Sequence, residues 1–243
     1  MSEKKIALVT GASSGIGRAI AEKLVKEGYE VYGIGRNFTD DTAAESQRIA
    51  DSAPAPKMHR LVYDLTDTKR LPNYLKENVK GKLSLLVNCA GAAYYGPHET
   101  LSPAAIHEMV TVNVEVPLLL TNRYLRDLRD GGTIVNVSSV TAKQNNNSFG
   151  CAYGATKAAV SHFSEALFEE TRKSGVRVIT VHPDLTDTNL YRNADFTPAD
   201  DADCVLTAEE VADAVLTAVQ ARDGLVVSDI TLRPQKNRIV RKS

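Results

Sequence analysis

The stretch Thr10–Gly17 has the sequence Thr-Gly-Ala-Ser-Ser-Gly-Ile-Gly and joins two segments of different periodicity. The apolar run Lys5–Val9 before it is typical of a buried strand, and Ile16–Glu27 after it has the spacing of an amphipathic helix. In such a turn the first glycine allows a sharp bend, the second allows a pyrophosphate to approach the backbone, and the third allows close helix packing. The N–H groups at the helix N-terminus favour bound phosphate. The contacts are expected from Gly11, Ser13, Ser14, Gly15, Ile16 and Gly17.

Short β-branched runs alternate with helical patterns along the rest of the chain. Further strands are expected at Glu30–Ile34, His59–Tyr63, Leu83–Asn88, Thr133–Val137, Val176–Val181 and Leu225–Ser228. Helices are expected at Ala43–Ala50, Asp67–Val79, Ser102–Leu128 (perturbed at Pro117), Ala152–Ser174 and Ala208–Ala221. This order predicts an α/β fold of the Rossmann type: a doubly wound parallel sheet of about seven strands with helices on both faces. We expect one domain over residues 1–243.

Composition and charge argue against several classes of function. A chain of 243 residues fits one large α/β domain, and its formal net charge of −1 argues against a nucleic-acid partner. No apolar run approaches the roughly 20 residues that span a bilayer, and no secretory signal precedes the first strand. The three cysteines and five histidines lack the spacing of a disulfide framework or a metal site. We therefore expect a cytoplasmic protein without a membrane segment or a metal.

Tyr153 and Lys157 stand four residues apart in an expected helix, so their side chains lie on one face. A free phenol titrates near pH 10 and is a poor base at neutral pH. A positive charge about 5 Å away stabilises the phenolate by roughly 3 kcal/mol at an effective dielectric of 20, or about two pKa units. The pair therefore predicts a general acid/base whose pKa is lowered by the lysine.

These motifs together resemble the short-chain dehydrogenase/reductase family in its compact single-domain form. The resemblance extends from Ile6 to about Thr231 and includes the glycine turn, the Tyr-x-x-x-Lys pair and Asn88-Cys89-Ala90-Gly91. It implies a catalytic tetrad of Asn113, Ser139, Tyr153 and Lys157. In that tetrad the serine orients the substrate oxygen, the tyrosine transfers the proton, and the lysine also binds the nicotinamide ribose. Asn113 supports the lysine through a bound water and a local irregularity in its helix.

The resemblance also implies the other cofactor contacts. They are Asp64, Leu65, Asn88, Ala90, Gly91, Tyr153, Lys157, Pro183 and Thr188. Two positions depart from the family pattern: Cys89 replaces an asparagine and is expected to be a small buried residue, and Asp184 replaces a glycine. The Asp184 carboxylate either faces the substrate or caps the following segment, and capping is favoured.

The end of the second strand indicates which cofactor is preferred. NAD-binding proteins commonly have an acidic residue there, and this chain has Gly35 followed by Arg36 and Asn37. The planar guanidinium of Arg36 suits a phosphate, and Asn37 and Ser13 offer neutral hydrogen bonds. The sequence predicts that NADP(H) is preferred over NAD(H), without excluding NAD(H). An aspartate at position 35 is expected to shift the preference towards NAD(H).

The predicted function is hydride transfer between NADP(H) and a small carbonyl or alcohol substrate. Two alternatives are a non-catalytic dinucleotide-sensing regulator, which has no need of Tyr153 and Lys157, and a sugar-nucleotide epimerase or dehydratase, which needs more C-terminal structure.

The long irregular segment 184–206 is expected to bind substrate. The basic segment Gln235–Ser243 is expected to be a solvated tail. Further pocket candidates are Tyr94, Tyr95, Gln144, Asn145, Asn147, Phe149 and Tyr191. A homo-oligomer, tetramer or dimer, is expected through helices 102–128 and 152–174, with Leu118, Leu119, Phe163, Leu167 and Phe168 as contact candidates.

Overall fold

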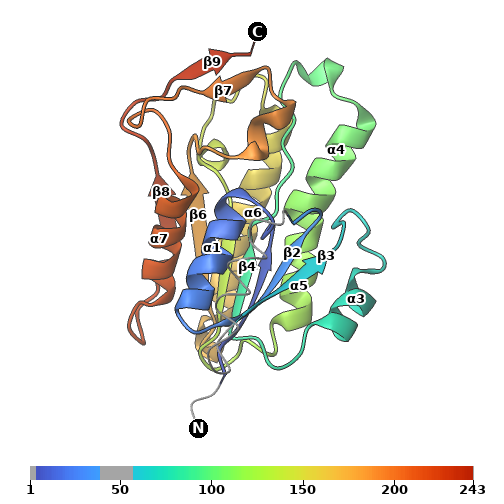
Figure 1. Cartoon of the computed structure of the whole chain (residues 1–243), viewed down its shortest axis with the longest axis vertical. Helices are drawn as coiled ribbons and strands as arrows, with labels where there is room; N and C mark the ends of the chain where they lie inside the picture. The colour runs from blue at the N-terminus through green and yellow to red at the C-terminus, as the bar shows by residue number, and fades with distance from the viewer. Residues whose placement is uncertain (1–3, 39–56, 243) are drawn as a thin grey trace.

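A computed structural model describes residues 4–38 and 57–242 of the chain. Figure 1 shows a central sheet flanked by helices, with the two termini at opposite ends of the molecule. The expected helix Ala43–Ala50 lies outside the described residues. Within the ranges that the structure covers, no helix is both long enough and apolar enough to cross a membrane.

The central sheet has seven strands in the order β3-β2-β1-β4-β5-β6-β8, and every neighbouring pair is parallel. The strands are β1 (Ile6–Thr10), β2 (Glu30–Gly35), β3 (Met58–Val62), β4 (Leu85–Asn88), β5 (Thr133–Val137), β6 (Arg177–Pro183) and β8 (Asp229–Leu232). The chain runs outward from β1 on one side and from β4 on the other. The predicted doubly wound α/β fold is therefore confirmed.

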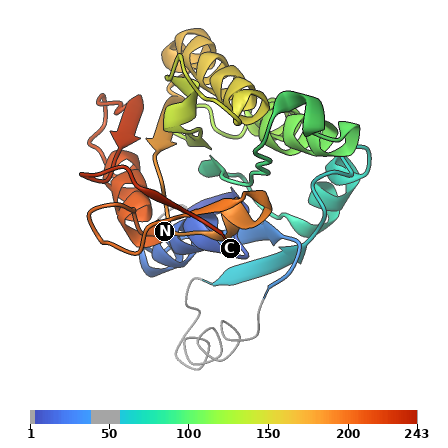
Figure 2. The same cartoon turned by 90° about the horizontal axis from the view of Figure 1, so that it is seen from above.

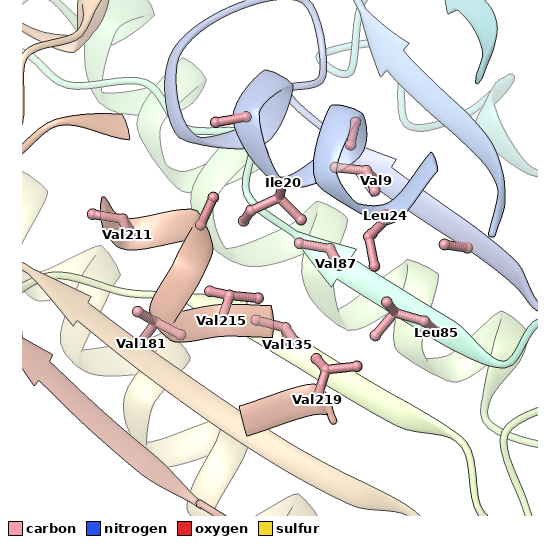
Figure 3. Close-up of a cluster of buried hydrophobic side chains, with 14 of the residues drawn as sticks. Val9, Ile20, Leu24, Leu85, Val87, Val135, Val181, Val211, Val215 and Val219 are labelled. Carbon is pink, nitrogen blue, oxygen red and sulfur yellow. The ribbon is translucent and has the colours of Figure 1, made fainter. Parts of the chain in front are cut away.

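Helices cover both faces of this sheet, as Figure 2 shows from above. They are α1 (Gly15–Lys26), α3 (Leu71–Asn78), α4 (Pro103–Val110), α5 (Val116–Tyr124), α6 (Cys151–Thr171) and α7 (Ala208–Val219). Helices α1 and α7 pack together on one face, where Ile20, Leu24 and Val215 lie against Val87 and Val135 of the sheet (Figure 3). The opposite face is covered by α3, α5 and α6. Burial on both faces explains why the strands are apolar throughout.

Local sequence explains where several helices begin. The Ser102 hydroxyl accepts a hydrogen bond from the Ala105 N–H, and a proline follows at the first helical position of α4. Helix α7 begins with a capping box, in which Thr207 and Glu210 each bond the other's backbone N–H. These caps fix the positions at which the chain enters each helix.

The expected helix Ser102–Leu128 is interrupted by a π-helical turn at Thr111–Glu115, which separates α4 from α5. The perturbation expected at Pro117 is found in the turn that precedes it. Pro117 has no N–H to donate back to the preceding turn, and its ring crowds the carbonyl four residues earlier, which belongs to Asn113 at the centre of the π turn. Such π turns are frequent at functional sites.

The C-terminal segment is not a solvated tail. Strand β9 (Ile239–Arg241) pairs antiparallel with β7 (Phe196–Pro198), and the two lie above the carboxyl ends of the main strands (Figure 1). Lys236 and Arg238 pair with Asp203 and Asp201. These basic residues thus pair with two acidic residues of segment 184–206. The same segment contains the short 3₁₀ helix Asn189–Asn193.

The last strand of the main sheet was predicted four residues too early. Leu225 is 44% exposed, and the strand is Asp229–Leu232, which pairs with β6. The alternation decides the register, because Ile230 and Leu232 pack against the core while Asp229 and Thr231 face outward.

Candidate active site

A cleft of about 920 Å³ opens at the carboxyl ends of the parallel strands. It includes the point where β1 and β4 diverge to opposite sides of the sheet, which is where ligands bind in open α/β sheets. Fifteen of the expected cofactor contacts line it, together with Ser139: Gly11, Ser13, Ser14, Gly15, Ile16, Gly17, Arg36, Asp64, Leu65, Ala90, Gly91, Tyr153, Lys157, Pro183 and Thr188. Asn37, Asn88 and Asn113 are expected site residues that do not line the cleft.

The glycine turn is held against the end of β4. Gly11 has a φ of 73°, and a Cβ added there would lie 2.9 Å from the Ala90 Cα. A Cβ added at Gly17 would lie 2.4 Å from the Gly11 carbonyl oxygen. The backbone N–H groups of Cys89 and Ala90 both donate to the Thr10 hydroxyl at 3.0 Å. The turn therefore excludes side chains at these two glycines and leaves the N-terminus of α1 open to the cleft.

Tyr153, Lys157 and Ser139 come together at the inner end of the cleft. Tyr153 and Lys157 lie on one face of α6, 3% and 4% exposed, and the Lys157 Nζ donates to the Val137 carbonyl at 2.8 Å. Ser139 follows β5, and its hydroxyl interacts with the Tyr153 phenol. Its neighbour Ser138 instead binds the Lys157 carbonyl and Ser161, so it ties β5 to α6.

The electrostatics of this group differ from the sequence-based expectation. Burial raises the pKa of Tyr153, with Tyr191 adding to the rise and the Ser139 hydrogen bond opposing it. Burial also lowers the pKa of Lys157 to about 8. Desolvation therefore outweighs the expected stabilisation of the phenolate by Lys157. Without a bound ligand, the phenol of Tyr153 is protonated at neutral pH.

Asn113 lies in the π turn, and its side chain is saturated by protein partners. It accepts from the Ala92 N–H at 2.8 Å and donates to the Ala92 carbonyl and the Thr156 hydroxyl at 2.9 Å. A Cβ added at Gly91 would lie 3.6 Å from the Asn113 Oδ1 and 3.7 Å from the Lys157 Nζ. The side chains of Asn113 and Lys157 therefore both border the space that a side chain at position 91 would fill.

Asn88 is buried within the sheet. Its amide nitrogen donates to the Asn136 Oδ1 at 2.8 Å, and Asn136 in turn donates to the Ser164 hydroxyl in α6. Asn88 therefore ties β4 to β5 and α6 behind the cleft. Cys89 packs against the core and lines the cleft, so it is half-buried where a small buried residue was expected, and burial raises the pKa of its thiol to about 12.

At the opposite end of the cleft, Arg36 lies at the end of β2 and its Nη1 is 3.5 Å from the Glu108 Oε1. A Cβ added at Gly35 would lie 2.6 Å from the Ser13 Cβ, so the glycine turn packs directly on this strand. The Asp64 carboxylate accepts from the N–H and hydroxyl of Thr66. The backbone bond is the main cause that lowers the pKa of Asp64, and Arg36 adds to it.

Thr188 and Asp184, which follow β6, also line the cleft. The Thr188 Cγ2 lies 3.0 Å from a Cβ added at Gly15, which places Thr188 over the glycine turn. The Asp184 carboxylate accepts from the Leu185 N–H at 2.9 Å. The bond reaches only the adjacent residue, and the cap of the following 3₁₀ helix is Thr188.

Three aromatic rings pack together in the cleft, and one of them, Tyr95, contacts Tyr153. Tyr95 lies 5.6 Å from the Tyr153 ring and 5.1 Å from Phe196, and Tyr191 lies 5.6 Å from Phe196, all between centroids. Gln144, Asn147 and Phe149 line the cleft as expected, whereas Tyr94 and Asn145 do not. Asn237, Ile239 and Arg241 also line the cleft, and no local pattern predicts this, because their position depends on the pairing of β9 with β7.

His182 is a buried histidine behind the serine. Its Nδ1 lies 3.2 Å from the Ser139 carbonyl and its Nε2 lies 2.9 Å from Asp229, which also pairs with Lys143. This network connects β6 and β8 with the loop that carries Ser139. No local motif predicts this role of His182, since its partners come from distant segments.

Most of the chain matches the sequence model of a known protein family. The family model described as short chain dehydrogenase matches residues 5–198. The chain belongs to the short-chain dehydrogenase family. It is thus an oxidoreductase of that family.

Individual relatives of this short-chain dehydrogenase cover most of its length. An uncharacterized oxidoreductase from Staphylococcus epidermidis is 30% identical over 238 residues, covering 96% of this chain and 98% of that protein. An NADPH-dependent 3-dehydrocapnine reductase from Ornithobacterium rhinotracheale is 32% identical over 200 residues, covering 78% and 68%. The crystal structure of a short chain dehydrogenase from Burkholderia cenocepacia in complex with NADP has a TM-score of 0.79 and 27% identity, covering 95% and 96%.

Proposed function

We propose that this enzyme transfers a hydride between NADP(H) and a small carbonyl or alcohol substrate, with Tyr153 as the general acid/base. The observation that carries the proposal is the position of Ser139, Tyr153 and Lys157 at the inner end of a cleft that begins at the glycine turn. A regulator that only binds a dinucleotide has no need of a buried lysine beside a buried tyrosine. Asn113 completes the proposed tetrad by holding the segment after β4 against α6.

In the reducing direction, each residue has a distinct task. The Ser139 hydroxyl donates a hydrogen bond to the substrate carbonyl oxygen and orients it. Tyr153 then gives its phenolic proton to that oxygen as the alcohol forms, and its protonated state suits this step. The bound nicotinamide supplies the hydride, and its chemistry belongs to the cofactor. Lys157 binds the nicotinamide ribose and stabilises the phenolate that the proton transfer leaves.

The residues of the outer cleft fit a phosphorylated dinucleotide. The N-terminus of α1 is open at the glycine turn, and Arg36, at the end of β2, lines the same cleft and is proposed to bind the 2′-phosphate of the adenosine ribose. NADP(H) is proposed as the preferred cofactor and NAD(H) as a weaker one. The NADPH-dependent and NADP-bound relatives support this assignment.

Segment 184–206 is proposed to bind the substrate. Tyr191 and Phe196 of this segment join Tyr95 in an apolar wall beside Tyr153. We further propose that the chain forms a homo-oligomer, with exposed leucines of α5 in the contact.

The test is a panel of ketones, aldehydes and alcohols, followed by NADPH absorbance. Oxidation of NADPH by at least one carbonyl compound, lost in the Tyr153→Phe variant, supports the proposal. NADPH binding without turnover of any panel member, together with no hydrogen exchange into bound cofactor, contradicts it and favours the regulator.

A further inference from the structure

Arg36 already has an anionic partner in the described part of the chain. Its Nη1 lies 3.5 Å from the Glu108 Oε1, and the two residues come from β2 and α4. Both residues line the cleft. The ion pair therefore crosses the region where the proposed 2′-phosphate would lie.

Glu108 is the fixed member of this pair. The Tyr94 hydroxyl donates to its Oε2 at 2.6 Å, and that bond is the main cause that raises the pKa of Tyr94. The Glu108 side chain is 21% exposed, whereas that of Arg36 is 53% exposed. A phosphate that binds Arg36 has to draw the guanidinium away from a carboxylate that stays in place.

We infer that Glu108 is a cofactor-specificity residue, which competes with the 2′-phosphate of NADP(H) for Arg36. Glu108 lies at one edge of the guanidinium, where its Oε1 is 3.5 Å from the Arg36 Nη1, and a phosphate that binds this edge has to displace it. The Glu108 carboxylate also repels the incoming phosphate. A 2′-hydroxyl meets neither cost, so Glu108 weakens NADP(H) binding and leaves NAD(H) binding nearly unchanged. The inference rests on the proposed role of Arg36 and adds a residue that opposes it.

The test measures dissociation constants of NADPH and NADH by calorimetry for wild type and Glu108→Gln. Glutamine keeps an acceptor for the Tyr94 hydroxyl and removes the charge. NADPH is expected to bind about two- to fivefold more tightly, the range set by an exposed ion pair, while NADH changes by less than that. Adenosine 2′,5′-bisphosphate, which carries the 2′-phosphate, should bind more tightly to Glu108→Gln, as NADPH does. The affinity for 5′-AMP, which lacks that phosphate, should not change. Glu99→Gln removes the same charge from an exposed residue outside the cleft and is expected to change neither cofactor.

Measurements in the Arg36→Ala variant separate the inferred role of Glu108 from the proposed role of Arg36 as the phosphate ligand. There, Glu108→Gln is expected to lose most of its selective effect, because no guanidinium remains to be released. Equal gains for NADPH and NADH, or an unchanged NADPH affinity, overturn the role of Glu108. Equal losses of both cofactors on Arg36→Ala alone overturn the role of Arg36 as the phosphate ligand.

Discussion

The Lys157 ammonium lies 5.8 Å from the centre of the Tyr153 ring, one helical turn away on the buried face of α6. The Val137 carbonyl holds the ammonium at 2.8 Å, below the sheet edge that carries Ser139. Because both groups are desolvated, the pKa of the phenol rises and that of the ammonium falls to about 8. Burial thus disfavours the charged form of both groups, although an ammonium with a pKa of about 8 keeps its charge at neutral pH and loses it above pH 8.

Binding of NADPH is expected to take up protons above pH 8. At pH 8.5 most of the free protein has a neutral Lys157, since the pKa is about 8. The anionic cofactor and its ribose hydroxyls favour the charged ammonium and raise that pKa. Calorimetry in buffers of different ionisation enthalpy measures the uptake, which should vanish at pH 6.5 and in Lys157→Met. Equal proton uptake by wild type and Lys157→Met would contradict the assignment.

Gly35→Asp is expected to weaken both cofactors instead of shifting the preference towards NAD(H). The sequence alone suggested a shift, but a Cβ at position 35 would lie 2.6 Å from the Ser13 Cβ. The glycine turn has to move to make room, and this turn is proposed to hold the phosphates that both cofactors share. Titration of Gly35→Asp with NADH and NADPH measures this. A tighter complex with NADH would show that the turn adapts without loss.

Lys236→Glu is expected to loosen the contact of β9 with segment 184–206. The substitution places a carboxylate against Asp203, which now pairs with Lys236 at 2.6 Å. Amide hydrogen exchange at Ile239–Arg241 should speed up by up to about fivefold, the upper range for an exposed pair, and less in high salt. The charge-swapped double variant with Asp203→Lys should restore slow exchange. Lys173→Glu, in the turn after α6, serves as the control. Unchanged exchange in Lys236→Glu would show that strand pairing alone holds β9.

Leu118→Asp and Leu119→Asp are expected to separate the proposed oligomer into monomers. These side chains are 39% and 38% exposed on α5, so a charge there costs little in the monomer and much in an apolar contact. Leu167, another expected contact residue, is 5% exposed in the core and is not available. Light scattering measures the mass, with Val62→Asp as the control on β3. A wild-type monomer at micromolar concentration would contradict the proposal.

Local patterns predicted most of the fold, because parallel strands buried on both faces leave unmistakable apolar runs. The strand Thr133–Val137 was predicted to the residue. The errors lie where long-range contacts decide. The pairing of β9 with β7 depends on segments that meet only after folding, and Pro117 predicts a perturbed helix but not that the perturbation is a π turn at Asn113.

The candidate site shows the same division. Motif spacing indicated the turn, the serine, the tyrosine and the lysine, and these all line one cleft. It did not reveal Glu108, His182 or Asp229, whose partners are far away in sequence. It also misjudged the direction of the Tyr153 pKa shift, since helical spacing gives the distance to a charge but not the depth of burial.

Turnover by the Tyr153→Phe variant tests the account most directly. The substitution keeps the ring that packs against Tyr95 and removes only the hydroxyl that transfers the proton. With a carbonyl substrate found in the panel, kcat should fall by about 10²- to 10⁴-fold, while the Kd for NADPH stays within about twofold of wild type. A kcat close to the wild-type value, with NADPH still bound, would contradict the assignment of Tyr153 as the general acid/base.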